Sequence, residues 1–281
     1  MEGIIIKNIS NDYLVKCNDR DYLCKARGKF RHMKQSPLVG DRVIIDSDNL
    51  YILDILSRKN YLFRPSVSNV DQAIIVSSVK RPELDTYLLD KLLTIISYYN
   101  IEPIICFTKM DLLDDGEKDN ITKYMDYYRK IGYKVVCNDD KEGILELLKG
   151  NITVLAGQSG VGKSSLINRL DSSFELKTDD ISLALNRGKH TTRHTELYEI
   201  NDGYIVDTPG FSDVSFMGMS KMDIRDNMKE MFEGVHYCKY RDCMHIKEDG
   251  CYVKEMVNNG KILESRYVNY CSFIKDGEIW K

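Results

Sequence analysis

One stretch decides the fold: Gly157-Gln158-Ser159-Gly160-Val161-Gly162-Lys163-Ser164-Ser165. It fits the pattern G-x-x-x-x-G-K-[ST] and follows the apolar run 152–156, so we expect a strand, a glycine-rich loop and then a helix. Glycines let backbone N–H groups converge on phosphate oxygens, and the helix start adds its positive dipole end. Lys163 is expected to reach the β- and γ-phosphates, and the Ser164 hydroxyl to ligate Mg²⁺. The alternative is a glycine-rich turn that binds nothing, but the helix-like segment 165–170 after the loop favours a nucleoside triphosphate site.

A second motif, Thr108-Lys109-Met110-Asp111, follows the apolar run 103–107 and has the form [NT]-K-x-D. It is expected at a strand end, where α/β sheets bind ligands. A carboxylate accepts two hydrogen bonds, and guanine offers N1–H and its 2-amino group side by side, whereas adenine would leave Asp111 unpaired. The stem of Lys109 would cover the face of the base. Four such residues alone could be an ordinary helix start, but together with the P-loop they predict guanine.

A third motif, Asp207-Thr208-Pro209-Gly210, follows the strand-like segment 204–206. Asp207 could hold Mg²⁺ through water, and the Gly210 N–H could meet the γ-phosphate. The polar loop 186–194 lies between the P-loop and this motif. Of its two threonines, Thr191 and Thr192, we favour Thr192 as the second hydroxyl on Mg²⁺.

The group that orients the attacking water is not obvious, because Phe211 follows Gly210 where Ras-like enzymes have a glutamine nearby. We favour His190 for this role and keep His194 in reserve; the alternative is that both are ordinary exposed histidines. We therefore expect slow intrinsic turnover that rises when a partner orders the loop.

The C-terminal region carries a cluster of potential metal ligands. Cys238-x₄-Cys243-x-His245-x₅-Cys251 supplies three thiols and one imidazole, enough for one closed, structural, tetrahedral zinc ion. His236 is the rival imidazole, and buried cysteines without a metal are the alternative. Because the segment looks poor in large apolar residues, we expect the metal to supply much of its folding energy.

Together these residues resemble the ribosome small subunit-dependent GTPase A family of bacteria over essentially the whole chain. The resemblance rests on GQSGVGKSSL at 157–166, GKHTT at 188–192, DTPGF at 207–211 and the cysteine cluster. The guanine motif precedes the P-loop, as in a circularly permuted GTPase. The resemblance implies an N-terminal OB-fold, a C-terminal zinc domain, and action late in assembly of the 30S subunit with stimulation by that subunit and contact with its 16S rRNA. It also places Cys137 and Asn138 where GTPases contact the guanine O6.

The expected architecture is α/β with three domains: an OB-fold RNA-binding barrel at 1–66, the permuted P-loop GTPase at 67–221 and a zinc-binding helical domain at 222–281. Five short apolar runs before residue 54 predict the barrel strands. Alternating strand and helix patterns after residue 70 predict a mostly parallel sheet with helices on both faces. The basic stretch 25–34 resembles a phosphate-tracking loop in which Phe30 stacks on a base; a solvated loop is the alternative.

Composition favours a soluble, cytoplasmic, monomeric protein without a membrane partner. The chain has 281 residues with 43 % hydrophobic content, and it shows neither an apolar run of membrane-spanning length nor a signal-peptide pattern. Eight cysteines in such a chain are expected to be thiols or metal ligands. The net charge of −3 confines any RNA contact to local patches. Two other classes stay open: a P-loop kinase, and an RNA-binding assembly factor whose nucleotide site is idle.

Overall fold

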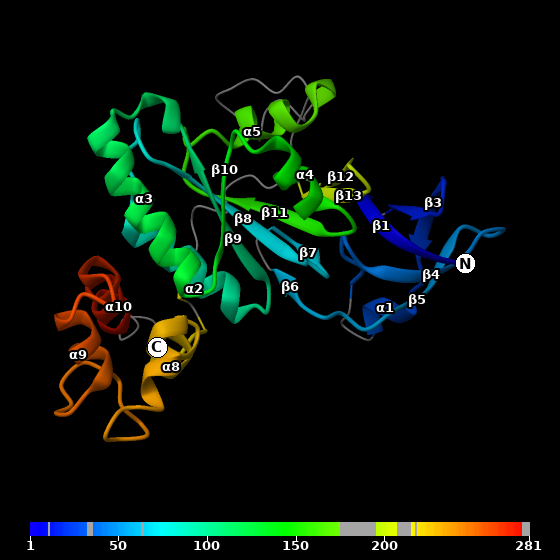
Figure 1. Cartoon of the computed structure of the whole chain (residues 1–281). Helices are drawn as coiled ribbons and strands as arrows, with labels where there is room; N and C mark the ends of the chain where they lie inside the picture. The colour runs from blue at the N-terminus through cyan, green and yellow to red at the C-terminus, as the bar shows by residue number, and fades with distance from the viewer. Residues whose placement is uncertain are drawn as a thin grey trace. The chain divides into compact units, whose positions relative to one another are not determined.

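The computed structural model describes residues 1–10, 12–32, 36–62, 65–174, 195–206, 215–216 and 218–276 (Figure 1). The chain forms two compact units. The first comprises residues 1–73, 140–155 and 163–211, and the second comprises residues 74–139, 156–162 and 212–281. The three domain boundaries expected from the sequence stay a prediction.

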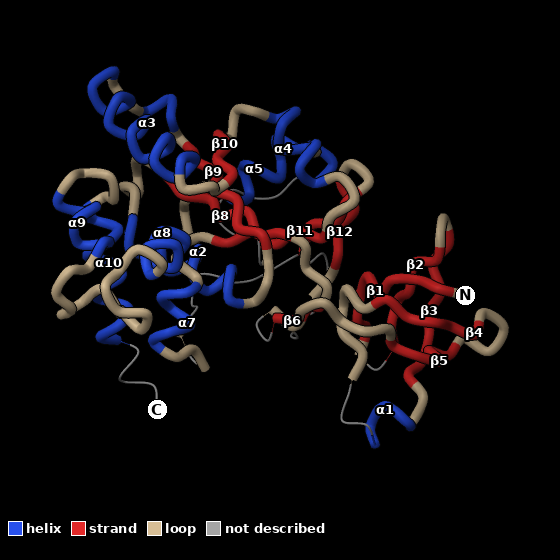
Figure 2. The backbone as a smooth tube through the Cα atoms, turned by 60° about the horizontal axis from the view of Figure 1, so that its bottom comes forward, coloured by secondary structure: helices blue, strands red, loops and turns tan. Residues whose placement is uncertain are grey.

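The first unit begins with a closed five-stranded barrel, as the sequence predicted. Its strands run in the order β1-β2-β3-β5-β4, and their pairings are antiparallel except for the parallel β3-β5 pair. Figure 2 shows them as a group of red segments at the N-terminus. Alternation along each strand sends Val15, Val43 and Ile52 into an apolar interior where they are fully buried. The strands are β1 (Glu2–Ile9), β2 (Asp12–Cys17), β3 (Arg20–Ala26), β4 (Arg42–Asp46) and β5 (Tyr51–Ile55).

The expectation that Phe30 is an exposed stacking ring was wrong. Residues 29–32 of the basic stretch form one helical turn, α1 (Lys29–His32), and Phe30 is only 3 % exposed. Burying a phenyl ring gains about 2 kcal/mol, which favours the folded turn over an open loop. The Lys29 ammonium lies 5.2 Å from the ring centroid, so the basic charge of this stretch is presented over a buried aromatic ring.

A buried carboxylate fastens the barrel to the segment that follows it. Asp41 is fully buried and accepts hydrogen bonds from Arg58 Nε and Nη2, each at 2.7 Å, and from Ser68 Oγ at 2.6 Å. Ser68 belongs to the short hairpin of β6 (Tyr61–Leu62) and β7 (Val67–Ser68). These charge-assisted bonds fix the path of the chain as it leaves the barrel.

Six further strands are joined by hydrogen bonds in the order β10-β9-β8-β11-β13-β12. The pairs β10-β9 and β11-β13 are parallel, and β12-β13 is antiparallel. Every residue of β8 and β11 is buried, as is typical of strands covered on both faces. These strands are β8 (Gln72–Ser78), β9 (Glu102–Thr108), β10 (Lys134–Cys137), β11 (Ile152–Ala156), β12 (Leu197–Ile200) and β13 (Gly203–Val206).

Helices alternate with these strands, and sequence periodicity located them. In α2 (Thr86–Tyr98) the predicted apolar face is buried, and Asp85 caps the N-terminus. In α3 (Asp115–Lys130) the side chains of Tyr127 and Tyr128 are buried. The remaining helices of this part are η1 (Met110–Leu112), α4 (Lys141–Leu148), α5 (Lys163–Leu170) and η2 (Ser172–Phe174).

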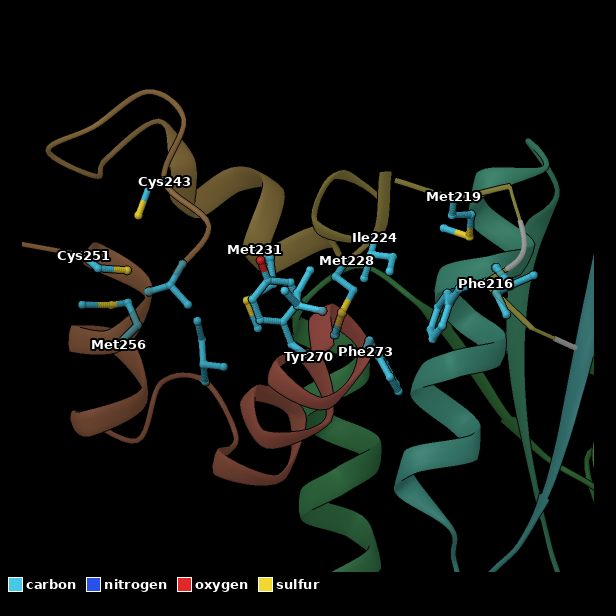
Figure 3. Packing of buried hydrophobic residues seen from close by; sticks show 14 residues of the cluster. Phe216, Met219, Ile224, Met228, Met231, Cys243, Cys251, Met256, Tyr270 and Phe273 are labelled. Atoms are coloured by element: carbon cyan, nitrogen blue, oxygen red, sulfur yellow. The ribbon is translucent and has the colours of Figure 1, made fainter. Parts of the chain in front are cut away.

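The second unit ends in four helices with a substantial apolar core (Figure 3). Tyr270 and Phe273 are fully buried among Ile224, Met228 and Met231, and the cluster extends to the two cysteines Cys243 and Cys251. The expectation that this segment has few large apolar residues was therefore wrong. The helices are α7 (Lys221–Asp226), α8 (Lys229–Val235), α9 (Tyr252–Asn258) and α10 (Glu264–Asp276). No helix in the described parts of the chain is both long and apolar enough to span a bilayer.

Candidate nucleotide site and metal centre

The glycine-rich loop has a backbone that side chains would obstruct. Gly157 has φ +132°, and a Cβ there would lie 2.3 Å from the carbonyl oxygen of Val76. Gly160 and Gly162 also have positive φ angles, of +79° and +101°. Helix α5 then begins at Lys163, as expected for a phosphate-binding loop.

The two polar residues at the start of α5 are largely withdrawn from solvent. Ser164 is 5 % exposed. Burial lowers the pKa of Lys163 to about 8. A polyphosphate next to this ammonium group would favour its charged form, so the geometry suits an anionic ligand.

The guanine motif and the glycine-rich loop meet inside the second unit. The Thr108 hydroxyl donates to the Val161 carbonyl at 2.6 Å, and Thr108 is only 2 % exposed. Lys109 Nζ donates to the Gly160 carbonyl at 2.8 Å and also to the carbonyl of Arg81. Lys109 itself adopts a left-handed backbone with φ 63°, which is uncommon for lysine. Two motifs far apart in the sequence are thus locked together by direct hydrogen bonds.

Asp111 lies on the turn that follows, with its side chain exposed. The turn η1 is closed by hydrogen bonds from Leu112 N to the Lys109 carbonyl at 3.1 Å and from Leu113 N to the Met110 carbonyl at 3.3 Å. An exposed carboxylate on an ordered turn beside the P-loop is accessible to a ligand. Its role as the guanine reader stays a prediction.

The residues after β10 lie beside the same strand end. Asn138 N donates to the Phe107 carbonyl at 2.9 Å, directly before Thr108, and Cys137 is half-buried at the end of β10. The segments 107–111 and 137–138 are therefore neighbours, as a shared base site requires. The remaining predicted nucleotide residues lie outside the described residues: His190, Thr191, Thr192, His194, Asp207, Gly210 and Phe211.

The four predicted zinc ligands converge. One potential ligand atom from each of Cys238, Cys243, His245 and Cys251 lies within 4.8 Å of all the others. The Cys238 and Cys251 sulfurs are 3.9 Å apart, and His245 Nδ1 lies 3.3 Å from Cys251 Sγ and 3.6 Å from Cys238 Sγ. Zn–S bonds of about 2.3 Å at tetrahedral angles place two sulfurs about 3.8 Å apart. The cluster thus fits one zinc ion.

A backbone contact sets the tautomer of His245. Its Nε2 lies 2.9 Å from the Met231 carbonyl oxygen, and because a carbonyl only accepts, Nε2 carries the proton. Nδ1 is then the unprotonated nitrogen that faces the sulfurs, which is the arrangement found in metal sites. Burial raises the pKa of Cys243 to about 12, so its thiolate needs a nearby cation.

The rival imidazole is placed differently. His236 is exposed at the C-terminal end of α8 and packs edge-on against Phe232, with ring centroids 5.7 Å apart. It is not part of the metal-binding group found among the described residues. His245 is therefore the imidazole of this centre. Sequence spacing could not have identified Met231 as its partner, because a backbone carbonyl leaves no signature in the sequence.

Comparison with known proteins follows this geometry. The family model described as "RsgA GTPase" matches residues 55–217, and that of the "RsgA N-terminal domain" matches residues 2–51. The chain belongs to the RsgA GTPase family. As a member of this family it is a GTPase, which decides against both the kinase and the idle nucleotide site.

Individual RsgA proteins are similar over nearly the full length of the chain. The "Small ribosomal subunit biogenesis GTPase RsgA" of Bacillus cereus is 44 % identical over 98 % of this chain and 97 % of its own. That of Enterococcus faecalis is 43 % identical over 99 % of this chain and 96 % of its own.

Two solved structures share the fold. YloQ, described as a circularly permuted GTPase, superposes with a TM-score of 0.86 at 36 % identity, covering 100 % of this chain and 96 % of its own. YjeQ from Thermotoga maritima has a TM-score of 0.83 at 35 % identity, covering 98 % of both chains. The predicted circular permutation is therefore confirmed.

Proposed function

We propose that this RsgA-family GTPase acts in late maturation of the small ribosomal subunit, and that its affinity for the subunit and its 16S rRNA depends on the bound nucleotide. The names of its relatives support this role, since they are described as biogenesis GTPases of that subunit. It would act as a monomer in the cytoplasm, where the subunits are assembled. The expected rRNA contacts involve the barrel and the C-terminal helical module.

Each nucleotide residue has a proposed task. Asp111 accepts two hydrogen bonds from guanine, while Lys109 covers the base and, with Thr108, holds the base loop to the P-loop. The observation that carries this assignment is the pair of hydrogen bonds from Thr108 and Lys109 to the P-loop carbonyls. Met110 completes the turn, and Cys137 and Asn138 contribute backbone near the guanine O6.

The tasks proposed for the phosphate-binding residues come from their sequence motifs, and for the P-loop they are supported by its glycine backbone. The backbone N–H groups of Gly157, Gln158, Ser159, Gly160, Val161, Gly162 and Ser165 surround the phosphates. Lys163 lies against the β- and γ-phosphates, and the Gly210 N–H bonds the γ-phosphate. Ser164, Thr192 and Asp207 would hold Mg²⁺, which when bound offsets the negative charge of the phosphates. His190 orients the attacking water, because Phe211 cannot do so through a hydrogen bond.

The Cys₃His centre holds one zinc ion as a structural element. A closed set of four protein ligands leaves no position for a reacting water. The ion would fix the path of residues 236–251 against the helical core. It has no proposed part in hydrolysis.

The test is GTP turnover with and without purified small ribosomal subunits, with ATP as the nucleotide control. We expect cleavage of GTP alone and a strong acceleration by subunits. An unchanged rate would remove the ribosomal part of the proposal while leaving the GTPase intact. Hydrogen exchange in the 187–194 loop should also differ between GDP and a non-hydrolysable GTP analogue; equal protection would contradict nucleotide-dependent binding.

A further inference from the structure

Lys80 lies outside the nucleotide motifs and contacts the C-terminal end of residues 109–117, the segment that carries Asp111. Lys80 Nζ donates to both carboxylate oxygens of Glu117, at 2.8 and 2.6 Å. Glu117 lies in the first turn of α3, a few residues after Asp111. The pair is partly shielded, with side-chain exposures of 26 % for Lys80 and 41 % for Glu117. This two-pronged contact differs from an ordinary surface pair.

The next residue along the chain holds the near end of the same segment. The Arg81 carbonyl accepts a hydrogen bond from Lys109 Nζ, and the same ammonium group reaches the Gly160 carbonyl of the P-loop. The backbone of Lys80 is itself fixed to the end of β8, because the buried Ser78 hydroxyl donates to the Lys80 carbonyl at 2.8 Å. Two consecutive residues in the turn that follows β8, Lys80 and Arg81, therefore contact both ends of residues 109–117.

Hydrogen bonds within residues 109–117 connect the Lys80 contact at Glu117 to the backbone just after the Asp111 turn. Asp114 and Glu117 form a capping box, in which Glu117 N donates to Asp114 Oδ1 at 2.9 Å and Asp114 N donates to Glu117 Oε2 at 3.0 Å. Leu113, between this box and η1, is 7 % exposed and anchors the turn in the core. The Glu117 carboxylate thus accepts from the Lys80 ammonium and from the backbone just after the Asp111 turn.

We propose that the Lys80–Glu117 ion pair is a positioning device that sets where the Asp111 carboxylate meets the guanine edge. This inference rests on the proposed role of Asp111. Two simultaneous hydrogen bonds to N1–H and the 2-amino group demand a carboxylate placed within a fraction of an ångström. Hypoxanthine lacks the 2-amino group and can donate only the N1–H hydrogen bond to the carboxylate. Loosening the segment should therefore weaken guanine binding more than hypoxanthine binding.

A neighbouring pair on the same helix provides a matched control. Lys118 and Asp115 are 3.6 Å apart, with side-chain exposures of 49 % and 105 %, and form an ordinary surface ion pair. Lys118→Met removes a charge from the first turns of α3 without touching the Lys80 contact. Lys80→Met removes the ammonium group but keeps most of the aliphatic stem, and Lys80→Arg restores the charge.

The experiment measures the dissociation constants of GDP and inosine diphosphate for the full-length chain and these variants by competition against a fluorescent guanine nucleotide. For Lys80→Met we expect GDP affinity to fall about fivefold and the preference for GDP over inosine diphosphate to fall about threefold. Lys118→Met and Lys80→Arg should keep the wild-type preference. Circular dichroism confirms that each variant is folded.

Asp111→Asn separates the possible failures. It should reduce the guanine preference by itself, because a carboxamide cannot accept both hydrogen bonds. If Asp111→Asn shifts the preference but Lys80→Met lowers both affinities equally or neither, the positioning role is refuted and the Asp111 assignment survives. If Asp111→Asn leaves the preference unchanged, both are refuted. Loss of preference in Lys80→Arg equal to that in Lys80→Met would also refute the role of the charge.

Discussion

We expect replacement of Arg266 by methionine to destabilise the second compact unit by about 3–5 kcal/mol. Arg266 on α10 is fully buried between two carboxylates from different helices. Its Nη1 donates to Asp90 Oδ1 on α2 at 2.5 Å, and its Nε and Nη2 donate to Glu230 on α8 at 2.6 and 3.2 Å. The guanidinium carbon also lies 5.7 Å from the centroid of the Tyr128 ring on α3. Four helices thus meet at one cation.

The size of the stability loss depends on the hydrogen bonds that Asp90 and Glu230 would keep in the variant. Asp90 would retain donors from Asn269 at 2.7 Å and Tyr128 at 2.6 Å, and Glu230 would retain the Tyr127 hydroxyl at 2.8 Å. Hydrogen bonds remain, but two buried charges lose their counter-ion. Their repulsion is relieved when one acid takes up a proton, so the loss should not exceed that of a single broken buried pair.

The pH dependence of the variant has a definite sign. Burial raises the pKa of Asp90, although Arg266 opposes this. Burial would also raise the pKa of Glu230, but the charge of Arg266 and the hydrogen bonds that the carboxylate accepts together outweigh it and hold that pKa below its ordinary value. Without Arg266 the pKa of Asp90 should rise further and that of Glu230 should rise above its unfolded-state value. The protonated acids then stabilise the variant at low pH, so its deficit should shrink as the pH falls from 7 towards 5.

Urea denaturation followed by circular dichroism measures the effect, with the triple variant Arg266→Met, Asp90→Asn, Glu230→Gln as the control. The triple variant has none of these three charges in the helical core and should recover most of the stability. A loss below about 1 kcal/mol in Arg266→Met, or a triple variant no more stable than the single one, would refute the reasoning that an uncompensated buried charge is the cause.

Two further predictions concern the cysteines. Cys251→Ser should abolish stoichiometric zinc binding, measured by elemental analysis, and should raise hydrogen exchange in residues 236–251. Helix α10 should keep its protection from exchange, because α10 is held by apolar packing. Loss of protection in α10 would show instead that the metal stabilises the whole helical module. Burial raises the pKa of Cys106 to about 12 from its ordinary value near 9. The buried thiol therefore stabilises the fold below pH 9 and loses about 1.4 kcal/mol per pH unit as the pH rises towards 12. Relative to wild type, Cys106→Ala should become more stable over that window in denaturation measurements, whereas a pH-independent difference would contradict the assignment.

Local sequence patterns predicted the parts of the site that depend on local backbone. The P-loop, the turn with Asp111 and the cysteine spacing all demand particular residue types within a few positions, and their elements lie where the sequence placed them. The prediction for Phe30 was wrong because an aromatic residue in a basic stretch gives the same sequence pattern whether its ring stacks on a base or packs into the core. Which one occurs depends on the barrel beneath it.

The buried charges could not be predicted at all. The chain has 40 lysines and arginines, and no local pattern marks Arg266 as a residue that is fully withdrawn from water. Its partners lie on α2 and α8 and become neighbours only after the helices pack. The same holds for Lys80 and Glu117, which are ordinary surface residues in sequence. Tertiary contacts alone give these side chains their roles.

The order of the motifs along the chain bears on how the proposed nucleotide-dependent change would reach the flanking modules. In this chain residues 187–194 come shortly before β12 in the sequence, and within the first unit β12 is held by the barrel. Lys7 of β1 pairs with Glu196 at 2.7 Å, just before β12, and Lys16 of β2 contacts Glu199 within it. The segment after β13 runs into the C-terminal helices instead. Each of the two segments predicted to sense the γ-phosphate therefore continues covalently into an element tied to a different flanking module.

We expect the permutation to affect signalling to the flanking modules and not the nucleotide site itself. The ligand depends only on the spatial order of the motifs, so the site itself gains nothing from it. Permutation places the guanine motif early in the chain, so that both segments predicted to sense the γ-phosphate precede, in sequence, elements tied to the modules expected to bind RNA. A conformational change in either segment would then reach a flanking module along the chain, without passing through the central sheet. Neutralising Lys7 and Lys16 together should accordingly weaken the dependence of subunit binding on nucleotide while leaving guanine affinity unchanged. Subunit co-sedimentation with GDP and with a non-hydrolysable GTP analogue measures this dependence. If the difference in binding between the two nucleotides is as large as in wild type, the contacts of Lys7 and Lys16 with β12 and Glu196 do not transmit the nucleotide state.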